Sequence, residues 1–323
     1  MPAITVENIL TLPRLSRPDP AAGGVRPVSR VVTARRTLEG AGFVVRRPFP
    51  SEQLNFADPF LLLDHLGEVE YAPGEAKGAP WHPHRGFETV TYVIDGAISH
   101  HDSTGGGGLI ADGSTQWMTA GAGILHDEVP TEELVMKGGV FHAVQLWVNL
   151  PRDLKFTPPR YQDIDSGRLS LLSSHDGGAL VRLIAGELDG YSGPGVTWTP
   201  ITYAHASLSA GARLELGWKP QFNALAYVLS GQGKAGVEGA PIREGQLAVF
   251  GKGDSILIDA DVEQDTRSPK LEVLLLGGRP IREPVYFQGP FVMNTHQEII
   301  EAIQDFRAGR MGRIPAFTLE AQA

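Results

Sequence analysis

The sequence has no cysteine among its 323 residues, and this absence narrows the possible chemistry. Disulfides, thiolate catalysis and cysteine-based zinc or iron–sulfur sites are excluded, so any metal must be held by histidine and carboxylate. The chain also lacks an apolar run of the roughly 18 residues that a membrane span needs. Its first 24 residues show no charged-then-apolar signal pattern. We therefore expect a cytoplasmic protein without membrane contact.

An excess of basic residues is absent as well. The 28 Lys and Arg residues are outnumbered by 37 Asp and Glu residues, and the net charge of −9 argues against direct nucleic-acid binding. One local exception is the segment 26–47, which holds six Arg residues and a single Glu. We interpret it as a solvated face, and the alternative is a surface for an anionic partner.

What the sequence does contain is typical of short strands joined by turns. It has 39 Gly and 24 Pro residues, and segments 43–47, 89–94 and 144–148 are rich in β-branched and aromatic residues. Asp-Gly pairs at 95–96 and 112–113 mark turns between such segments. The pattern predicts an all-β fold of closed or sandwiched sheets.

A faint internal repeat indicates two copies of one β-domain. Segment 92–96 (YVIDG) matches segment 227–231 (YVLSG). Downstream, three further positions match at a slightly shorter offset, as a shortened loop would produce: Gly113, Gly121 and Ile124 correspond to Gly245, Gly253 and Ile256.

Two short motifs in the first copy carry the chemistry. Side chains two apart on a strand point to the same face, so His82 and His84 form one in-phase pair, and His126 and Glu128 form another. Three imidazoles and a carboxylate suit Fe²⁺, with Mn, Ni, Co, Cu or Zn as other candidates. Four protein ligands on an octahedral ion leave positions open for oxygen or substrate, which favours iron and a reactive site.

The carboxylate ligand has a rival in Glu88. The strand period also puts Glu88 on the face of His84, unless Gly86 breaks the phase, so spacing leaves Glu88 and Glu128 both open. We regard either as a candidate catalytic base. The adjacent His100 and His101 point to opposite faces, and we interpret them as structural.

Alignment of the two copies shows which residues of the second copy correspond to the candidate ligands. His82 and His84 fall on Gly217 and Lys219, and the other pair falls on Ile258 and Ala260, so we expect no metal there. We predict an N-terminal extension (1–27), a metal-bearing domain (28–150), a linker (151–159), a metal-free domain (160–288), and a C-terminal helix and tail (289–323).

The C-terminal helix is predicted over 295–308. Thr295 and Glu298 fit a capping box, and Ile299, Ile303 and Phe306 recur at helical spacing. The apolar stripe must then be buried against a sheet.

At these residues the sequence resembles the pirin family of the cupin superfamily. Five runs carry the resemblance: 58–64 (DPFLLLD), 82–92 (HPHRGFETVTY), 116–121 (QWMTAG), 145–151 (QLWVNLP) and 289–295 (GPFVMNT). The resemblance implies a bicupin, two stacked double-stranded β-helix barrels, with iron in the first. It also implies His82, His84, His126 and Glu128 as ligands, with Glu88 in a supporting role. Asp127 departs from the Ser that pirins commonly have, and the extension before residue 28 is not explained.

The resemblance implies two kinds of function. Some pirins resemble quercetinases, which open a flavonol ring with molecular oxygen, and others act as iron- and redox-dependent partners of other proteins. We expect an oxidoreductase of the first kind, a quercetin 2,3-dioxygenase acting on a small aromatic substrate with O₂. The alternative is a non-catalytic regulator that binds a protein partner.

Overall fold

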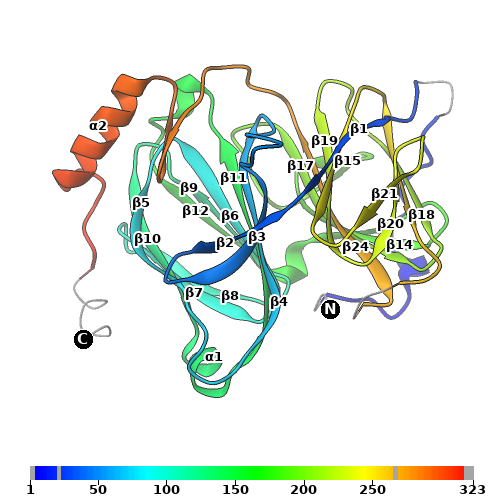
Figure 1. Cartoon of the computed structure of the whole chain (residues 1–323), viewed down its shortest axis with the longest axis horizontal. Coiled ribbons are helices and arrows are strands. Elements are labelled where there is room, and N and C mark those ends of the chain that lie inside the picture. Colours follow the sequence, from blue (N-terminus) through cyan, green and yellow to red (C-terminus); the bar gives the residue numbers. More distant parts are fainter. Residues whose placement is uncertain (1–3, 20–22, 265–267, 316–323) are drawn as a thin grey trace.

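The computed structural model describes residues 4–19, 23–264 and 268–315 and shows two β-barrels side by side (Figure 1). Each barrel combines a seven-stranded sheet with a four-stranded sheet. Among the described residues the only α-helices are two short ones, α1 (Glu132–Lys137) and α2 (His296–Arg307). The predicted all-β architecture of two barrels is confirmed.

The sheets of the first barrel come mainly from the first half of the chain. Its seven-stranded sheet has the order β12 (Arg160–Ile164), β9 (Thr115–Thr119), β6 (Phe87–Asp95), β11 (Gly139–Asn149), β4 (Phe60–Tyr71), β3 (Phe43–Phe49) and β2 (Arg35–Glu39). Its four-stranded sheet has the order β5 (Ala79–His84), β10 (Ile124–Pro130), β7 (Ala97–Asp102) and β8 (Gly107–Ala111).

The second barrel repeats this arrangement. Its seven-stranded sheet has the order β1 (Val28–Thr33), β22 (Gln246–Phe250), β19 (Asn223–Ser230), β24 (Lys270–Gly278), β17 (Ile201–Ser209), β14 (Ala179–Ala185) and β13 (Ser170–Ser173). Its four-stranded sheet has the order β18 (Arg213–Gly217), β23 (Ser255–Ala260), β20 (Gln232–Ala235) and β21 (Ala240–Arg243). Two hairpins complete the strands: β15 (Glu187–Leu188) with β16 (Tyr191–Ser192), and β25 (Tyr286–Gln288) with β26 (Phe291–Met293).

The strand orders confirm the internal repeat. The matched segments 92–96 and 227–231 lie on β6 and β19, which hold the same place in their sheets. Strand β23 corresponds to β10, and its Ile258 and Ala260 are buried in the hydrophobic cluster that fills the second barrel. The positions of His126 and Glu128 in the first barrel therefore correspond to residues of the hydrophobic core in the second.

The two barrels exchange edge strands. Strand β1, which the sequence assigned to the first domain, pairs with β22 of the second barrel. Strand β12, assigned to the second domain, pairs with β9 of the first. The lead-in before β1 also lies along the second barrel, where Leu15 is buried in the core. Sheet membership thus crosses the predicted sequence boundaries at residues 28 and 160, because a strand pattern in the sequence does not specify its partner.

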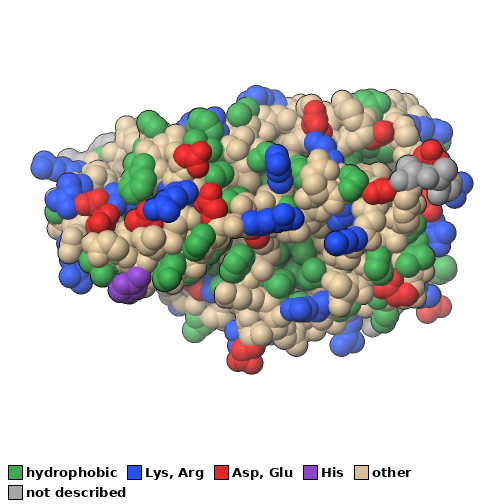
Figure 2. Space-filling model, turned by 90° about the horizontal axis from the view of Figure 1, so that it is seen from above, with side chains coloured by type: hydrophobic (Ala, Val, Ile, Leu, Met, Phe, Trp, Pro, Cys, Tyr) green, Lys and Arg blue, Asp and Glu red, His purple; other side chains and the backbone are tan. Residues whose placement is uncertain are grey.

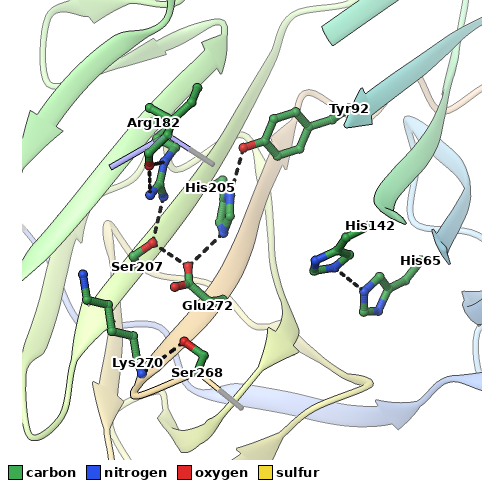
Figure 3. Close-up of polar contacts among 10 residues, drawn as sticks. His65, Tyr92, His142, Arg182, His205, Ser207, Ser268, Lys270 and Glu272 are labelled. Atoms are coloured by element: carbon green, nitrogen blue, oxygen red, sulfur yellow. Dashed lines mark hydrogen bonds and ion pairs between the residues drawn. The ribbon is translucent and has the colours of Figure 1, made fainter. Parts of the chain in front are cut away.

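The seven-stranded sheets face each other across an interface with a large hydrophobic cluster and a set of buried polar side chains. Figure 3 shows a hydrogen-bonded chain there. The Arg182 guanidinium donates to the Ser207 hydroxyl at 2.8 Å, and Ser207 donates to the Glu272 carboxylate. His205 contacts Glu272 at 3.0 Å through Nε2 and the Tyr92 hydroxyl at 3.0 Å through Nδ1. Tyr92 belongs to the first barrel and the other four residues to the second. This series of hydrogen bonds therefore fixes how the two barrels dock.

A second polar contact joins two buried histidines of the first barrel. The Nε2 atoms of His65 and His142 lie 2.8 Å apart, so one ring donates and the other accepts. His65 also contacts the Tyr227 hydroxyl of the second barrel at 3.2 Å. Burial lowers the pKa of His142 to about 3 and that of His65 well below its usual value, so both rings are neutral at physiological pH.

After β24 the chain crosses back over the molecule and ends with α2 beside the first barrel (Figure 1). The Thr295 hydroxyl accepts a hydrogen bond from the backbone N–H of Glu298, as the capping prediction required. Ile299 and Ala302 are buried against β26, whereas the predicted stripe residue Phe306 is 41% exposed. The described residues contain no helix of the length and apolarity that crossing a membrane requires.

Candidate metal centre

Strands β5 and β10 bring three histidines together inside the first barrel. They pair antiparallel, with His126 directly opposite His82. His84, two residues further along β5, points to the same face. One ring nitrogen from each of these three histidines lies within 4.8 Å of the others, close enough to bind one ion. The structure thus assembles the three histidines that the two motifs singled out.

The outer nitrogen of each ring is already occupied. His82 Nδ1 contacts the Pro80 carbonyl at 2.8 Å, and His84 Nδ1 contacts the Pro290 carbonyl at 3.3 Å. His126 Nδ1 contacts His100 Nε2 at 3.1 Å. These contacts fix the ring orientations and leave Nε2 of each ligand pointing inward, which is the arrangement of histidines that bind metals.

The inward nitrogens fit a divalent cation. The Nε2 atoms of His82 and His84 lie 3.0 Å apart. Nε2 of His126 is buried without a hydrogen-bond partner among the described residues. Burial lowers the pKa of His84 and of His126 well below the usual value, so both rings stay neutral and offer lone pairs. Neutral imidazoles of this geometry suit Fe, Cu, Zn or Ni.

Glu128 borders this cluster but its carboxylate makes other contacts. Oε1 accepts a hydrogen bond from the Thr91 hydroxyl at 2.6 Å, and Oε2 accepts one from the Gln145 amide at 2.8 Å. The pairing of β10 with β5 shifts register between His126 and Glu128, with the extra residue on β5. The convergent cluster therefore holds the three histidines, and Glu128 lies beside it with both oxygens hydrogen bonded.

Glu88 is not brought into the site. Gly86, in the left-handed region at φ +91°, separates β5 from β6, and the strand phase is broken there. The Glu88 carboxylate accepts a hydrogen bond from the Thr119 hydroxyl at 2.6 Å and does not line the cavity. Burial raises the pKa of Glu88 to about 7. Of the two carboxylates that spacing left open, Glu88 is therefore the one that lies away from the cavity.

A cavity of about 510 Å³ opens beside the histidines. Its walls are mostly apolar and aromatic and include Trp81, Trp147 and Phe287. Trp147 and Phe287 stack with their ring centroids 5.6 Å apart. Gln145 and Glu128 are among the polar groups that reach into it. The cavity can enclose a flat aromatic molecule next to the metal.

Other aromatic side chains lie in and around the first barrel. Trp81 lines the cavity, and Phe87 packs on Trp147. Trp117 is buried in the interface between the barrels. Phe287 was missed because it arrives from the far end of the chain, on the hairpin β25–β26, with no local pattern linking it to β5.

A buried lysine, Lys155, links the hairpin β25–β26 to the first barrel. The sequence did not reveal this role of Lys155. Lys155 Nζ donates to the carbonyls of Gly86 and Val292 at 2.8 and 3.0 Å, and to the Asn149 side chain at 2.8 Å. These contacts hold the start of β6, the end of β11 and the C-terminal hairpin together. The Pro290 carbonyl that contacts His84 is thereby fixed in place.

Most arginines of segment 26–47 are held by hydrogen bonds or ion pairs within the chain. Arg26 is buried and donates to backbone carbonyls of the second barrel, including that of Phe222 at 2.9 Å. Arg47 forms ion pairs with Asp64 and Glu39, and Arg46 pairs with a glutamate of the second barrel. Figure 2 shows basic and acidic side chains interspersed over the visible face.

Family models place this chain among known proteins. The Pirin model matches residues 42–148, and the Pirin C-terminal cupin domain model matches residues 203–312. The chain belongs to the pirin family. The bicupin prediction is therefore confirmed, with the histidine cluster in the domain that the first model matches.

Individual relatives extend the match over most of the chain. A Pseudomonas aeruginosa protein with a provisional quercetin 2,3-dioxygenase name is 40% identical over 282 residues, covering 87% of this chain and 96% of its own. Human pirin is 38% identical over 294 residues, covering 90% and 95%. A crystal structure titled quercetin 2,3-dioxygenase from Acinetobacter baumannii superposes with a TM-score of 0.82 at 36% identity, covering 90% of this chain and all of that one.

Proposed function

We propose that this pirin is a metal-dependent dioxygenase, with Fe²⁺ as its metal, that cleaves quercetin or a related flavonol with molecular oxygen. The observation that carries the proposal is the juxtaposition of the three convergent Nε2 atoms with the aromatic cavity. A site built only to bind a structural ion would be closed, whereas here an open cavity of about 510 Å³ adjoins the histidines. The dioxygenase titles among its relatives support the same reaction class.

The side chains around the cavity suit a planar, hydroxylated substrate. Trp147 and Phe287 provide a stacked aromatic wall against which a flat ring can lie. Gln145 and Thr91 provide polar groups near the metal end. When bound, the metal supplies a Lewis acid and a template that orients substrate and oxygen.

We assign Glu128 two candidate roles at this position, as the fourth metal ligand and as the base that accepts the substrate's hydroxyl proton. Its carboxylate lies at the cavity wall, held by Thr91 and Gln145. As a base it would stay in place. As a ligand it would have to leave one of these hydrogen bonds and turn towards the histidines.

The proposal is tested by aerobic turnover of quercetin with protein reconstituted with Fe²⁺. We expect consumption of O₂ and release of carbon monoxide in equal amounts, and loss of both in His84→Ala. The same assay is run with Mn, Ni, Co, Cu and Zn. Absence of turnover with every one of these metals, in protein shown to have bound them, would refute the proposal.

The two roles of Glu128 are separated by Glu128→Gln. If Glu128 is the base, the variant keeps its metal affinity and loses turnover. If it is a ligand, metal affinity falls as well, by at least the roughly 10- to 100-fold that loss of a residue supporting a ligand costs. Glu88→Gln is the matched control, and we expect it to retain both properties because Glu88 lies outside the cavity.

The alternative function, metal-dependent binding of a protein partner, has weaker support. The basic segment that motivated it is mostly paired with acidic groups or carbonyls of the same chain. A pull-down with the protein held in its Fe²⁺ and Fe³⁺ forms checks this function. Partners that differ between the two forms, together with no turnover of quercetin, would favour it over the dioxygenase.

A further inference from the structure

Two adjacent histidines on β7 contact adjacent residues of β10 and have different environments. His100 is fully buried and contacts the ligand His126. His101, pointing to the opposite face, contacts the Asp127 carboxylate at 2.8 Å, and its side chain is 36% exposed. His100 is therefore directed towards the metal site, and the neighbouring His101 is directed away from it.

We propose that His100 is a positioning residue that selects the tautomer of His126 and so directs its Nε2 to the metal. This inference rests on the proposed metal site. For Nε2 of His126 to offer a lone pair, the ring hydrogen must be on Nδ1, which needs an acceptor. His100 Nε2, 3.1 Å away, is the hydrogen-bond partner that the structure gives it.

The pattern of hydrogen-bond donors and acceptors extends from His100 to Gln116. His100 accepts through Nε2, so its own ring hydrogen is on Nδ1 and requires an acceptor in turn. The side-chain amide of Gln116, on β9, contacts His100 Nδ1. The pattern assigns the amide oxygen of Gln116 to that position, since the amide nitrogen would place two donors against each other.

The His100 ring is also held from its face. Tyr161, on β12, stacks on it with ring centroids 5.5 Å apart and an angle of 15°. Strand β12 follows the interdomain linker and joins the first barrel as an edge strand. The exchanged strand thus helps to orient a residue behind the metal site.

The supports of the three ligands differ in kind. His82 and His84 contact backbone carbonyls, which can only accept. His126 contacts a side chain that can donate or accept, so its tautomer depends on His100 and Gln116. The support of His126 can therefore be removed by mutating His100, and the effect of that mutation on metal binding can be measured.

The experiment compares four variants of the full chain, with Co²⁺ as the metal probe. His100→Phe keeps a ring for Tyr161 to stack on but removes the acceptor, and His100→Gln restores an acceptor oxygen near the Nε2 position. His101→Phe is the control on the opposite face. Gln116→Met removes only the acceptor for His100 and serves if His100→Phe does not fold. The readouts are the Co²⁺ dissociation constant, the visible Co²⁺ spectrum and the melting temperature of the metal-free protein.

We expect His100→Phe to weaken Co²⁺ binding by about 10- to 100-fold and to change the spectrum, and His100→Gln to recover most of the affinity. Gln116→Met should weaken binding by a smaller factor. His101→Phe should lower the melting temperature, because Asp127 is buried, yet leave Co²⁺ affinity and spectrum unchanged. Wild-type affinity and spectrum in His100→Phe or, where that variant does not fold, in Gln116→Met would overturn the inference. Failure of the wild-type protein to bind Co²⁺ would instead refute the proposed metal site itself.

Discussion

Replacement of Glu88 by glutamine should change how the stability of this protein depends on pH. The Glu88 side chain is fully buried, and burial raises its pKa from the usual 4.5 to about 7. Between these two values the folded protein keeps a proton that the unfolded chain has released. The unfolding free energy contributed by this group therefore falls as pH rises from about 4.5 to about 7, and the loss is complete above pH 7.

The size of this change in unfolding free energy follows from the difference between the unfolded and folded pKa values of Glu88. Each pKa unit is worth about 1.4 kcal/mol, so ionised Glu88 costs the folded state about 3 kcal/mol at pH 8, as an order of magnitude. Glutamine is neutral at every pH and nearly isosteric with the protonated acid. We expect Glu88→Gln and wild type to be about equally stable near pH 5, and the variant to be more stable by about 2–3 kcal/mol at pH 8.

Urea denaturation of both metal-free proteins at several pH values between 5 and 8.5 measures this difference. Glu133→Gln is the matched control, because the Glu133 side chain is 75% exposed and its replacement should change the unfolding free energy by no more than about 0.5 kcal/mol. A difference between Glu88→Gln and wild type that stays constant with pH would refute the assignment of a protonated, buried Glu88.

Three further changes test other parts of the structure. Ile258→Ala should lower the unfolding free energy by about 2–5 kcal/mol, measured by urea denaturation, because the side chain is fully buried in the second barrel; a loss below 1 kcal/mol would contradict that packing. Thr295→Ala should cost about 1 kcal/mol through the lost cap of α2, and an unchanged melting temperature would show that the cap is not formed. Phe287→Ala should raise KM for quercetin several-fold with little change in kcat, whereas a selective loss of kcat would contradict its role as a wall.

Much of the metal site could be predicted because its signal is local. His82, His84 and His126 lie in two short motifs whose alternation fixes their common face. The repeat then showed that Ile258 and Ala260 take the place of ligands in the second copy, and the structure places both in an aliphatic core. Periodicity likewise located α2 and its cap to within a residue or two.

The features that the sequence did not reveal depend on partners far away in the chain. Glu88 is a local exception: spacing left it open as a candidate, because alternation alone cannot show whether Gly86 adopts the left-handed conformation that breaks the strand phase. Phe287 reaches the cavity, and Lys155 pins the hairpin that carries it, through contacts across long sequence separations. The exchange of β1 and β12 was missed because the sequence of an edge strand does not indicate which sheet the strand will join.

The metal centre is tested most directly by anaerobic titration of the metal-free protein with Fe²⁺, with His126→Ala measured in parallel. The structure predicts one Fe²⁺ per chain in the wild-type protein and loss of that binding in the variant, because His126 supplies one of the three convergent nitrogens. Equal binding by both proteins, or no binding by the wild type, would contradict a metal held by these histidines.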